Sequence, residues 1–116
     1  MKTNLIILFG SQISGNTRPT SDIDVAVLAD HPLSIKDKEE VSEQIAKDMH
    51  ISSDLIDLVD LNTASPLLQH SIAQTGRLLS GTEYDFLRFK VLAWKRYQDT
   101  AKFRLRRAEV LNAGIK

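Results

Sequence analysis

The sequence predicts a small α/β domain in which helices back a mixed β-sheet of about four strands. Three observations support this prediction. Short apolar runs at residues 5–9, 23–28 and 55–61 have the length and composition of buried strands. Segments with helical spacing of apolar residues separate the later runs. From Thr82 the chain contains no glycine or proline until Gly114, which indicates one long C-terminal helix.

The first two strands are expected on either side of a polar loop. Leu5–Phe9 is a continuous apolar run that ends abruptly at Gly10. Ser11–Ser14 has room for a short helix, and the residues that follow are dense in turn formers. In Ile23–Leu28 successive side chains alternate between two faces, so the odd-numbered Ile and Val lie on one face and the even-numbered residues on the other.

The remaining elements follow from local start and stop signals. Ser34 and Asp37 form a variant capping box that opens a helix with a core-facing stripe of Val41, Ile45 and Met49. Leu55–Leu61 is the third strand. Pro66 suits the first turn of the next helix, which stops at Gly76, and Arg77–Leu79 can form a short edge strand.

The composition is that of one soluble domain covering residues 1–116. There is no cysteine, so disulfides and thiolate metal sites are excluded, and a cytoplasmic location is expected. No apolar run is long enough to cross a membrane. The net charge is zero, but residues 77–116 are basic, which indicates either a solvated helix or a surface for a polyanion or an acidic partner.

Two carboxylates stand at the start of the second strand. Asp22 and Asp24 project from the same strand face and repel each other unless a cation lies between them. Mg²⁺ takes oxygen ligands of this kind, usually one or two carboxylates together with substrate phosphates. Gly10 and Ser11, at the end of the first strand, supply a phosphate-binding turn, because glycine lets the backbone approach a phosphate closely.

The third strand offers one further candidate ligand. Asp57 and Asp60 fall on opposite faces because their separation is odd, so at most one of them belongs to a metal site. Asp57 lies in mid-strand among leucine and isoleucine and is the better ligand. Asp60 is at the strand exit and is expected to serve as a turn or capping residue.

The Gly-Ser pair and the two aspartates together resemble the GS-x10-DxD signature of the nucleotidyltransferase superfamily, which has a DNA polymerase β-like fold. Over nearly the whole chain the sequence looks like the minimal nucleotidyltransferase (MNT) antitoxins that accompany HEPN-domain toxins. The resemblance implies the nucleotidyltransferase topology. It also implies that Asp57 is the third carboxylate, since the family places it at the first aspartate of a comparable xDxxDL strand.

The activity implied by this resemblance is transfer of AMP from ATP to a hydroxyl, with a tyrosine of a HEPN toxin as acceptor. Asp22 and Asp24 would bridge two Mg²⁺ ions, and Asp57 would hold the catalytic ion and could act as general base. Gly10 and Ser11 would hold the β and γ phosphates. The sequence departs from relatives at Gln12 and Ser14, where they often carry Arg-Ala-x-Gly-like residues.

Two other functions stay open at this point. A small-molecule nucleotidyltransferase of the aminoglycoside-modifying kind would use the same aspartates, although it normally needs a second domain. An antitoxin could also neutralise its toxin by occlusion, with little or no catalysis. Nucleic acid is not expected as a partner, and the oligomeric state, homomeric or heteromeric, is left open.

The long C-terminal helix is expected to behave differently in its two halves. The first half is apolar over a wide arc and is predicted to be core throughout, with the residues Phe86, Leu87, Phe89, Val91, Leu92, Trp94 and Tyr97. The second half keeps a narrow stripe of Ala101, Leu105, Ala108 and Leu111 among arginines, and this stripe is predicted to dock the partner. The alternative is that this half folds back or pairs with a second copy.

Overall fold

The computed structural model describes residues 2–10 and 23–114, with the backbone alone for residue 102 and residues 104–114. The elements occur in the order β1 (Thr3–Phe9), β2 (Ile23–Ala29), α2 (Ile35–Met49), a 3-10 turn (Ser53–Leu55), β3 (Ile56–Asp60), α3 (Pro66–Thr75), β4 (Arg77–Ser80) and α4 (Glu83–Gly114). The predicted fold class is confirmed. Within the described residues no helix is both long enough and apolar enough to span a membrane.

The four strands form one mixed sheet in the order β3-β2-β1-β4. β1 pairs antiparallel with β2 and with β4, whereas β2 pairs parallel with β3. The parallel pair requires a crossover, and α2 supplies it. The third strand is shorter than predicted because Leu55 closes the 3-10 turn and Leu61 lies beyond the strand.

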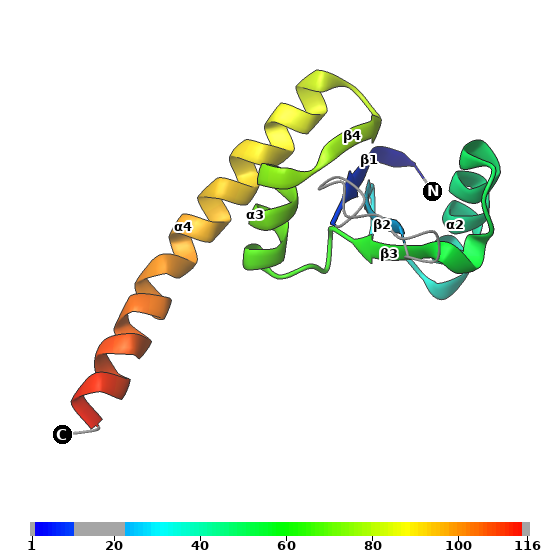
Figure 1. Ribbon diagram of the computed structural model, residues 1–116. Coiled ribbons are helices and arrows are strands. Elements are labelled where there is room, and N and C mark those ends of the chain that lie inside the picture. Colours follow the sequence, from blue (N-terminus) through cyan, green and yellow to red (C-terminus); the bar gives the residue numbers. More distant parts are fainter. Residues whose placement is uncertain (1, 11–22, 115–116) are drawn as a thin grey trace.

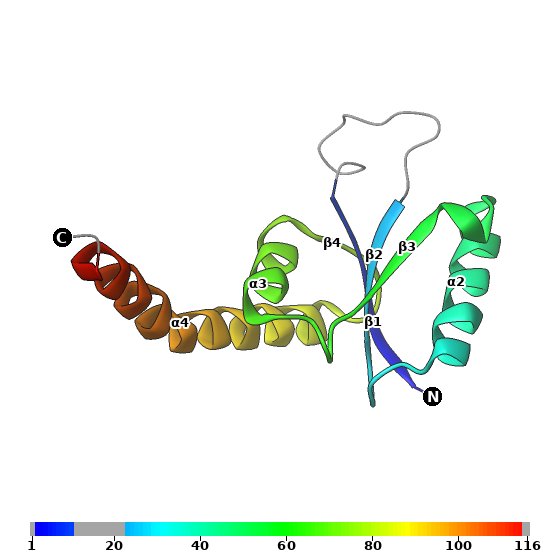
Figure 2. The ribbon, with the colours of Figure 1, turned by 90° about the horizontal axis from the view of Figure 1, so that it is seen from below.

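Helices cover both faces of this sheet. Figure 2 shows α2 on one side and α3 with α4 on the other. Val25 and Val27 pack toward α2, against Val41 and Ile45. Ala26 belongs to the cluster on the opposite face, so β2 alternates between the faces as predicted.

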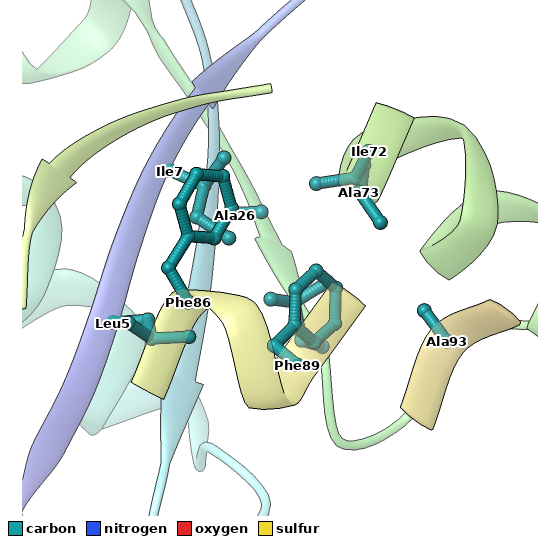
Figure 3. Packing of buried hydrophobic residues seen from close by; sticks show 9 residues of the cluster. Leu5, Ile7, Ala26, Ile72, Ala73, Phe86, Phe89 and Ala93 are labelled. Carbon is teal, nitrogen blue, oxygen red and sulfur yellow. The ribbon is translucent and has the colours of Figure 1, made fainter. Parts of the chain in front are cut away.

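The core on the α3–α4 side is the larger of the two clusters. Figure 3 shows the rings of Phe86 and Phe89 directed from α4 toward the strands and α3. The members of this cluster are Leu5, Ile7, Ala26, Leu61, Ile72, Ala73, Phe86, Phe89 and Ala93. Because β1 and β2 contribute to it directly, this cluster fixes the strands that carry the candidate site.

Both predicted helix starts are confirmed. Ser34 accepts a hydrogen bond from the Asp37 N–H, and the Asp37 carboxylate accepts one from the Ser34 N–H, which completes the capping box of α2. Ser65 caps α3 by accepting from the Leu68 N–H, with Pro66 in the first turn. Each cap involves residues three positions apart in the sequence, which is why the sequence alone predicted both helix starts.

The prediction for the first half of α4 is wrong in part. Phe86 and Phe89 are buried and Tyr97 is half-buried. The other four predicted core residues are exposed, to 60%, 56%, 38% and 57%: Leu87, Val91, Leu92 and Trp94. The helix meets the sheet and α3 along one side only, and it continues beyond α3 (Figure 1). Of the predicted docking stripe, Ala101 is half-buried, and the side chains of Leu105, Ala108 and Leu111 lie outside the description.

Candidate functional site

The strand ends that carry the predicted site residues lie next to each other. In the sheet register Phe9 of β1 is opposite Asp24 of β2, and Asp24 is opposite Asp57 of β3. Residues that are direct partners on neighbouring strands, about 4.8 Å apart, project from the same face. Asp24 and Asp57 therefore form a carboxylate pair at the end of the sheet where β1 ends and β2 begins.

Gly10 closes this site from the β1 side. Its φ is +81°, in the left-handed region that favours glycine. A Cβ added at Gly10 would overlap the Oδ2 atom of Asp24, and it would lie 3.0 Å from the Cγ atom. The Gly10 backbone thus lies directly against the Asp24 carboxylate, and a side chain at this position is excluded both by conformation and by space.

The burial of the two carboxylates differs. Asp57 is exposed and Asp24 is half-buried. Both lie on the sheet face that α3 and α4 cover farther along the strands, because Asp24 alternates with Ala26, and Asp57 with Val59. The end of the sheet thus carries one exposed carboxylate, that of Asp57, beside the half-buried Asp24.

These residues fit a divalent cation. Mg²⁺ prefers oxygen ligands and binds through one or two carboxylates plus substrate phosphates. Asp24 and Asp57 provide two carboxylates, and the backbone of Gly10 lies beside them. Within residues 2–10 and 23–114, no three His, Asp or Glu side chains gather into a metal-binding group. The predicted metal ligand Asp22 and the predicted phosphate-binding residue Ser11 lie outside the described residues.

Asp60 has the structural role that the sequence predicted. It is 5% exposed, and its Oδ2 accepts a hydrogen bond of 2.8 Å from the Leu33 N–H. Its Oδ1 accepts one of 3.0 Å from the Asn62 N–H. The carboxylate ties the end of β3 to the segment that precedes α2, and it faces away from Asp57.

Asn62 has a structural role that was not predicted from the sequence. The Asn62 side-chain amide donates to the carbonyl oxygens of Ala29 and His31, at 2.9 and 3.1 Å. Together with Asp60 it secures the parallel pair β2–β3 at the end opposite the carboxylates. The adjacent Asp60-Leu61-Asn62 sequence carried the signal, since Asp and Asn near a strand end are typical of hydrogen-bonded turns.

A cavity of about 730 Å³ lies elsewhere in the molecule. It is lined by Lys2 and Asn4 at the start of β1, by Leu28 near the end of β2, and by residues of α4 such as Arg88 and Arg96. β1 runs from this cavity toward the carboxylate pair, and the antiparallel strand β2 runs back from the pair toward the cavity. The cavity and the candidate site are therefore at opposite ends of the sheet.

The sequence matches known proteins over most of its length. Residues 1–85 match the polymerase beta nucleotidyltransferase family. A protein adenylyltransferase MntA of Shewanella oneidensis is 39% identical over 84% of this chain and 68% of its own length. The MntA of Aphanizomenon flos-aquae is 36% identical over 76% of this chain and 65% of its own length. The chain thus spans about two thirds of these two relatives.

Solved structures give the same result. A toxin–antitoxin complex with AMP-PNP contains a chain that superposes with a TM-score of 0.75 at 32% identity, covering 100% of this chain and 89% of the other. A complex of an MNT antitoxin with the tri-AMPylated HEPN toxin of Shewanella oneidensis gives a TM-score of 0.67 at 31% identity, over 99% and 85% of the two chains. This chain belongs to the polymerase beta nucleotidyltransferase family, and within that family to its minimal, MntA-type members.

Proposed function

We propose that this chain is an antitoxin that transfers AMP from ATP to a hydroxyl of a cognate HEPN toxin and thereby neutralises it. The observation that carries the proposal is that Gly10, Asp24 and Asp57 lie together at one end of the sheet in a chain of the nucleotidyltransferase family. The related proteins are protein adenylyltransferases, and one solved relative is bound to an AMPylated HEPN toxin. Another contains the ATP analogue AMP-PNP.

Each site residue has a role in this reaction. Asp24 and Asp57, with Asp22, would hold Mg²⁺. When bound, two such ions stabilise the charge on the entering and leaving oxygens of an in-line displacement. Gly10 and Ser11 would hold the β and γ phosphates through backbone N–H groups, and a side chain at Gly10 would displace the Asp24 carboxylate.

The reaction forms one bond and breaks one. The acceptor hydroxyl oxygen, which we propose is that of a tyrosine, attacks the α-phosphorus of ATP. The bond from that phosphorus to the α–β bridging oxygen breaks, and pyrophosphate leaves. Asp57, which is exposed, would take the hydroxyl proton as general base.

A transfer assay tests the proposal. The purified chain is incubated with ATP labelled on the α phosphate, Mg²⁺ and a candidate HEPN partner. We expect label on the HEPN protein from the wild-type chain and from Asp48→Asn, whose carboxylate is on α2, but not from Asp24→Asn. Chelation of the divalent cation should abolish transfer. Transfer by Asp24→Asn at the wild-type rate would contradict the assignment.

A toxin-rescue assay in cells separates catalysis from occlusion. The Asp22→Asn/Asp24→Asn variant replaces two carboxylates by amides of nearly the same shape, so the rest of the surface of the chain is unchanged. Rescue by this variant equal to that of the wild type would show that the antitoxin acts by occlusion. Loss of rescue with an intact complex would show that neutralisation is catalytic.

A further inference from the structure

One face of α4 carries a row of large apolar side chains that the fold leaves exposed. Tyr84, Leu87, Val91 and Trp94 are 72%, 60%, 56% and 57% exposed. Their spacing is three, four and three residues, so they form one continuous stripe on the helix. We call these four residues the outer stripe. It lies on the side of the helix that faces away from the core residues Phe86, Phe89 and Ala93.

Single exposed apolar residues are ordinary on a protein surface, but the four side chains of the outer stripe are contiguous. A repeat of alternating three- and four-residue steps is the seam along which one α-helix packs against another. The side chains are also large, and Trp and Tyr are enriched among the residues that dominate binding energies. The outer stripe therefore has the chemistry and the periodicity of a helix-docking surface.

The charges beside the outer stripe indicate what kind of helix it accepts. Arg88 and Lys95 follow Leu87 and Trp94 by one residue each and flank the stripe on one side. On the other side, Lys90 and Glu83 precede Val91 and Tyr84 by one residue each. The flanks thus carry three cations and one anion. In an antiparallel pair of identical chains Arg88 would lie opposite Lys95, and in a parallel pair Lys90 would lie opposite Lys95, so either pairing would bring cations together.

We infer that the outer stripe docks an amphipathic helical face of the HEPN toxin whose rim is acidic. The inference rests on the proposed function, because the toxin is the partner that function requires. Solved relatives of this chain are antitoxins in complexes with their toxins, one of them a HEPN toxin. The surface also differs from the C-terminal stripe predicted from sequence, since it lies on the half of α4 that is anchored to the sheet and α3.

Matched variants test this surface. Leu87→Glu/Val91→Glu places two carboxylates in the outer stripe. The control, Ile35→Glu/Leu67→Glu, changes two side chains on α2 and α3 that are 80% and 59% exposed. Binding to the purified toxin is measured by calorimetry. We expect the stripe variant to raise Kd by at least about tenfold and the control to bind like the wild type, with both melting temperatures within about 3 °C of the wild type.

A second pair of changes tests the charge complementarity. Arg88→Ala/Lys95→Ala removes cations beside the outer stripe without altering its apolar residues. We expect slower association with the toxin and a weaker dependence of the association rate on salt, because flanking charges act chiefly on encounter. If the association rate and its salt dependence are unchanged, the inference that the toxin's helical face has an acidic rim is overturned.

Other outcomes overturn the docking surface itself. Wild-type affinity of the stripe variant would do so. So would a dimer of the chain alone that the variant dissociates, because the stripe would then join two copies. If Leu87→Glu/Val91→Glu and the milder Leu87→Ser/Val91→Ser both melt far below the wild type, the stripe is core. A wild-type chain that binds the toxin through this surface but transfers no AMP would contradict the proposed function and leave the surface standing.

Discussion

Asp57 and Asp60 have the same chemistry and lie three residues apart in β3, yet their surroundings are opposite. Asp57 is exposed beside Asp24, whereas Asp60 is buried and accepts hydrogen bonds from two backbone N–H groups. The odd separation predicted from sequence that the two lie on opposite faces, because a strand alternates its faces, and the position of Asp60 at the strand exit predicted its role in a turn. The contact between Gly10 and the Asp24 carboxylate could not be predicted, since it depends on how β1 and β2 pair.

The two aspartates of β3 should therefore fail in different assays. Asp57→Ala should abolish AMP transfer while leaving the free energy of unfolding nearly unchanged. Asp60→Ala should retain transfer but lose about 1–3 kcal/mol of stability, because the N–H groups of Leu33 and Asn62 lose their acceptor. Labelled-AMP transfer and urea unfolding measure the two effects. The reverse ranking would show that the facing of β3 has been misassigned.

Gly10 provides a second test at this scale. Gly10→Ala should stop transfer, because the added Cβ meets the Asp24 carboxylate and the residue is left in a left-handed conformation that costs about 1 kcal/mol. Gly81→Ala is the matched control, since Gly81 also has a positive φ, of +121°, and a Cβ there meets the Asn4 carbonyl oxygen at 2.6 Å. It should lose stability and keep transfer. Loss of transfer in both variants would mean that stability alone explains the effect.

The separate helices and strands show which signals are local. The start of α2 is set by Ser34 and Asp37, and sequence predicted it from two residues. The exposure of the outer stripe was missed for a different reason. Periodicity reveals that Leu87, Val91 and Trp94 are apolar, but it does not reveal whether another part of the chain covers them.

The capping box of α2 should make stability depend on pH. The hydrogen bond from the Ser34 N–H lowers the pKa of the Asp37 carboxyl below its ordinary value of 3.8, and the Ser34 hydroxyl and His31 act in the same direction. The carboxylate thus contributes stability above pH 3.8, and this contribution is lost as the pH falls through the lower, folded-state pKa. Asp37→Asn should be less stable than the wild type at pH 7, and the gap should narrow toward pH 3. Urea unfolding at both pH values measures it; an equal gap at both would contradict the capping role of the charge.

Over the whole molecule, the resemblance to nucleotidyltransferases predicted the topology and periodicity did not. Apolar runs indicate strands, but the order β3-β2-β1-β4 and the parallel pairing of β2 with β3 are long-range properties. The radius of gyration is 16.6 Å, compared with about 13 Å for a compact chain of this length. The difference arises from α4, which extends beyond the sheet and α3 (Figure 1).

Removing the extended end of α4 should leave the fold intact. The ring of Tyr97 stacks on His70 of α3, with centroids 4.0 Å apart, and the buried residue Ala93 lies before it. A chain ending at Thr100 keeps these contacts, so its melting temperature should stay within about 3 °C of the wild type. Small-angle scattering should show a clear fall in the radius of gyration. A much lower melting temperature would show that residues beyond Thr100 stabilise the sheet.

The length of α4 also affects how the free chain rotates in solution. Its 32 residues span about 48 Å at 1.5 Å per residue, close to the longest dimension of the molecule, 56 Å, against 31 and 26 Å for the others. The molecule should tumble like a rod, more slowly end over end than about its long axis. Because helical N–H bonds point along the helix, the α4 amides should share a higher ratio of transverse to longitudinal ¹⁵N relaxation rates than amides of the sheet. Binding of a large partner to the side of this helix would make the molecule rounder and reduce that difference.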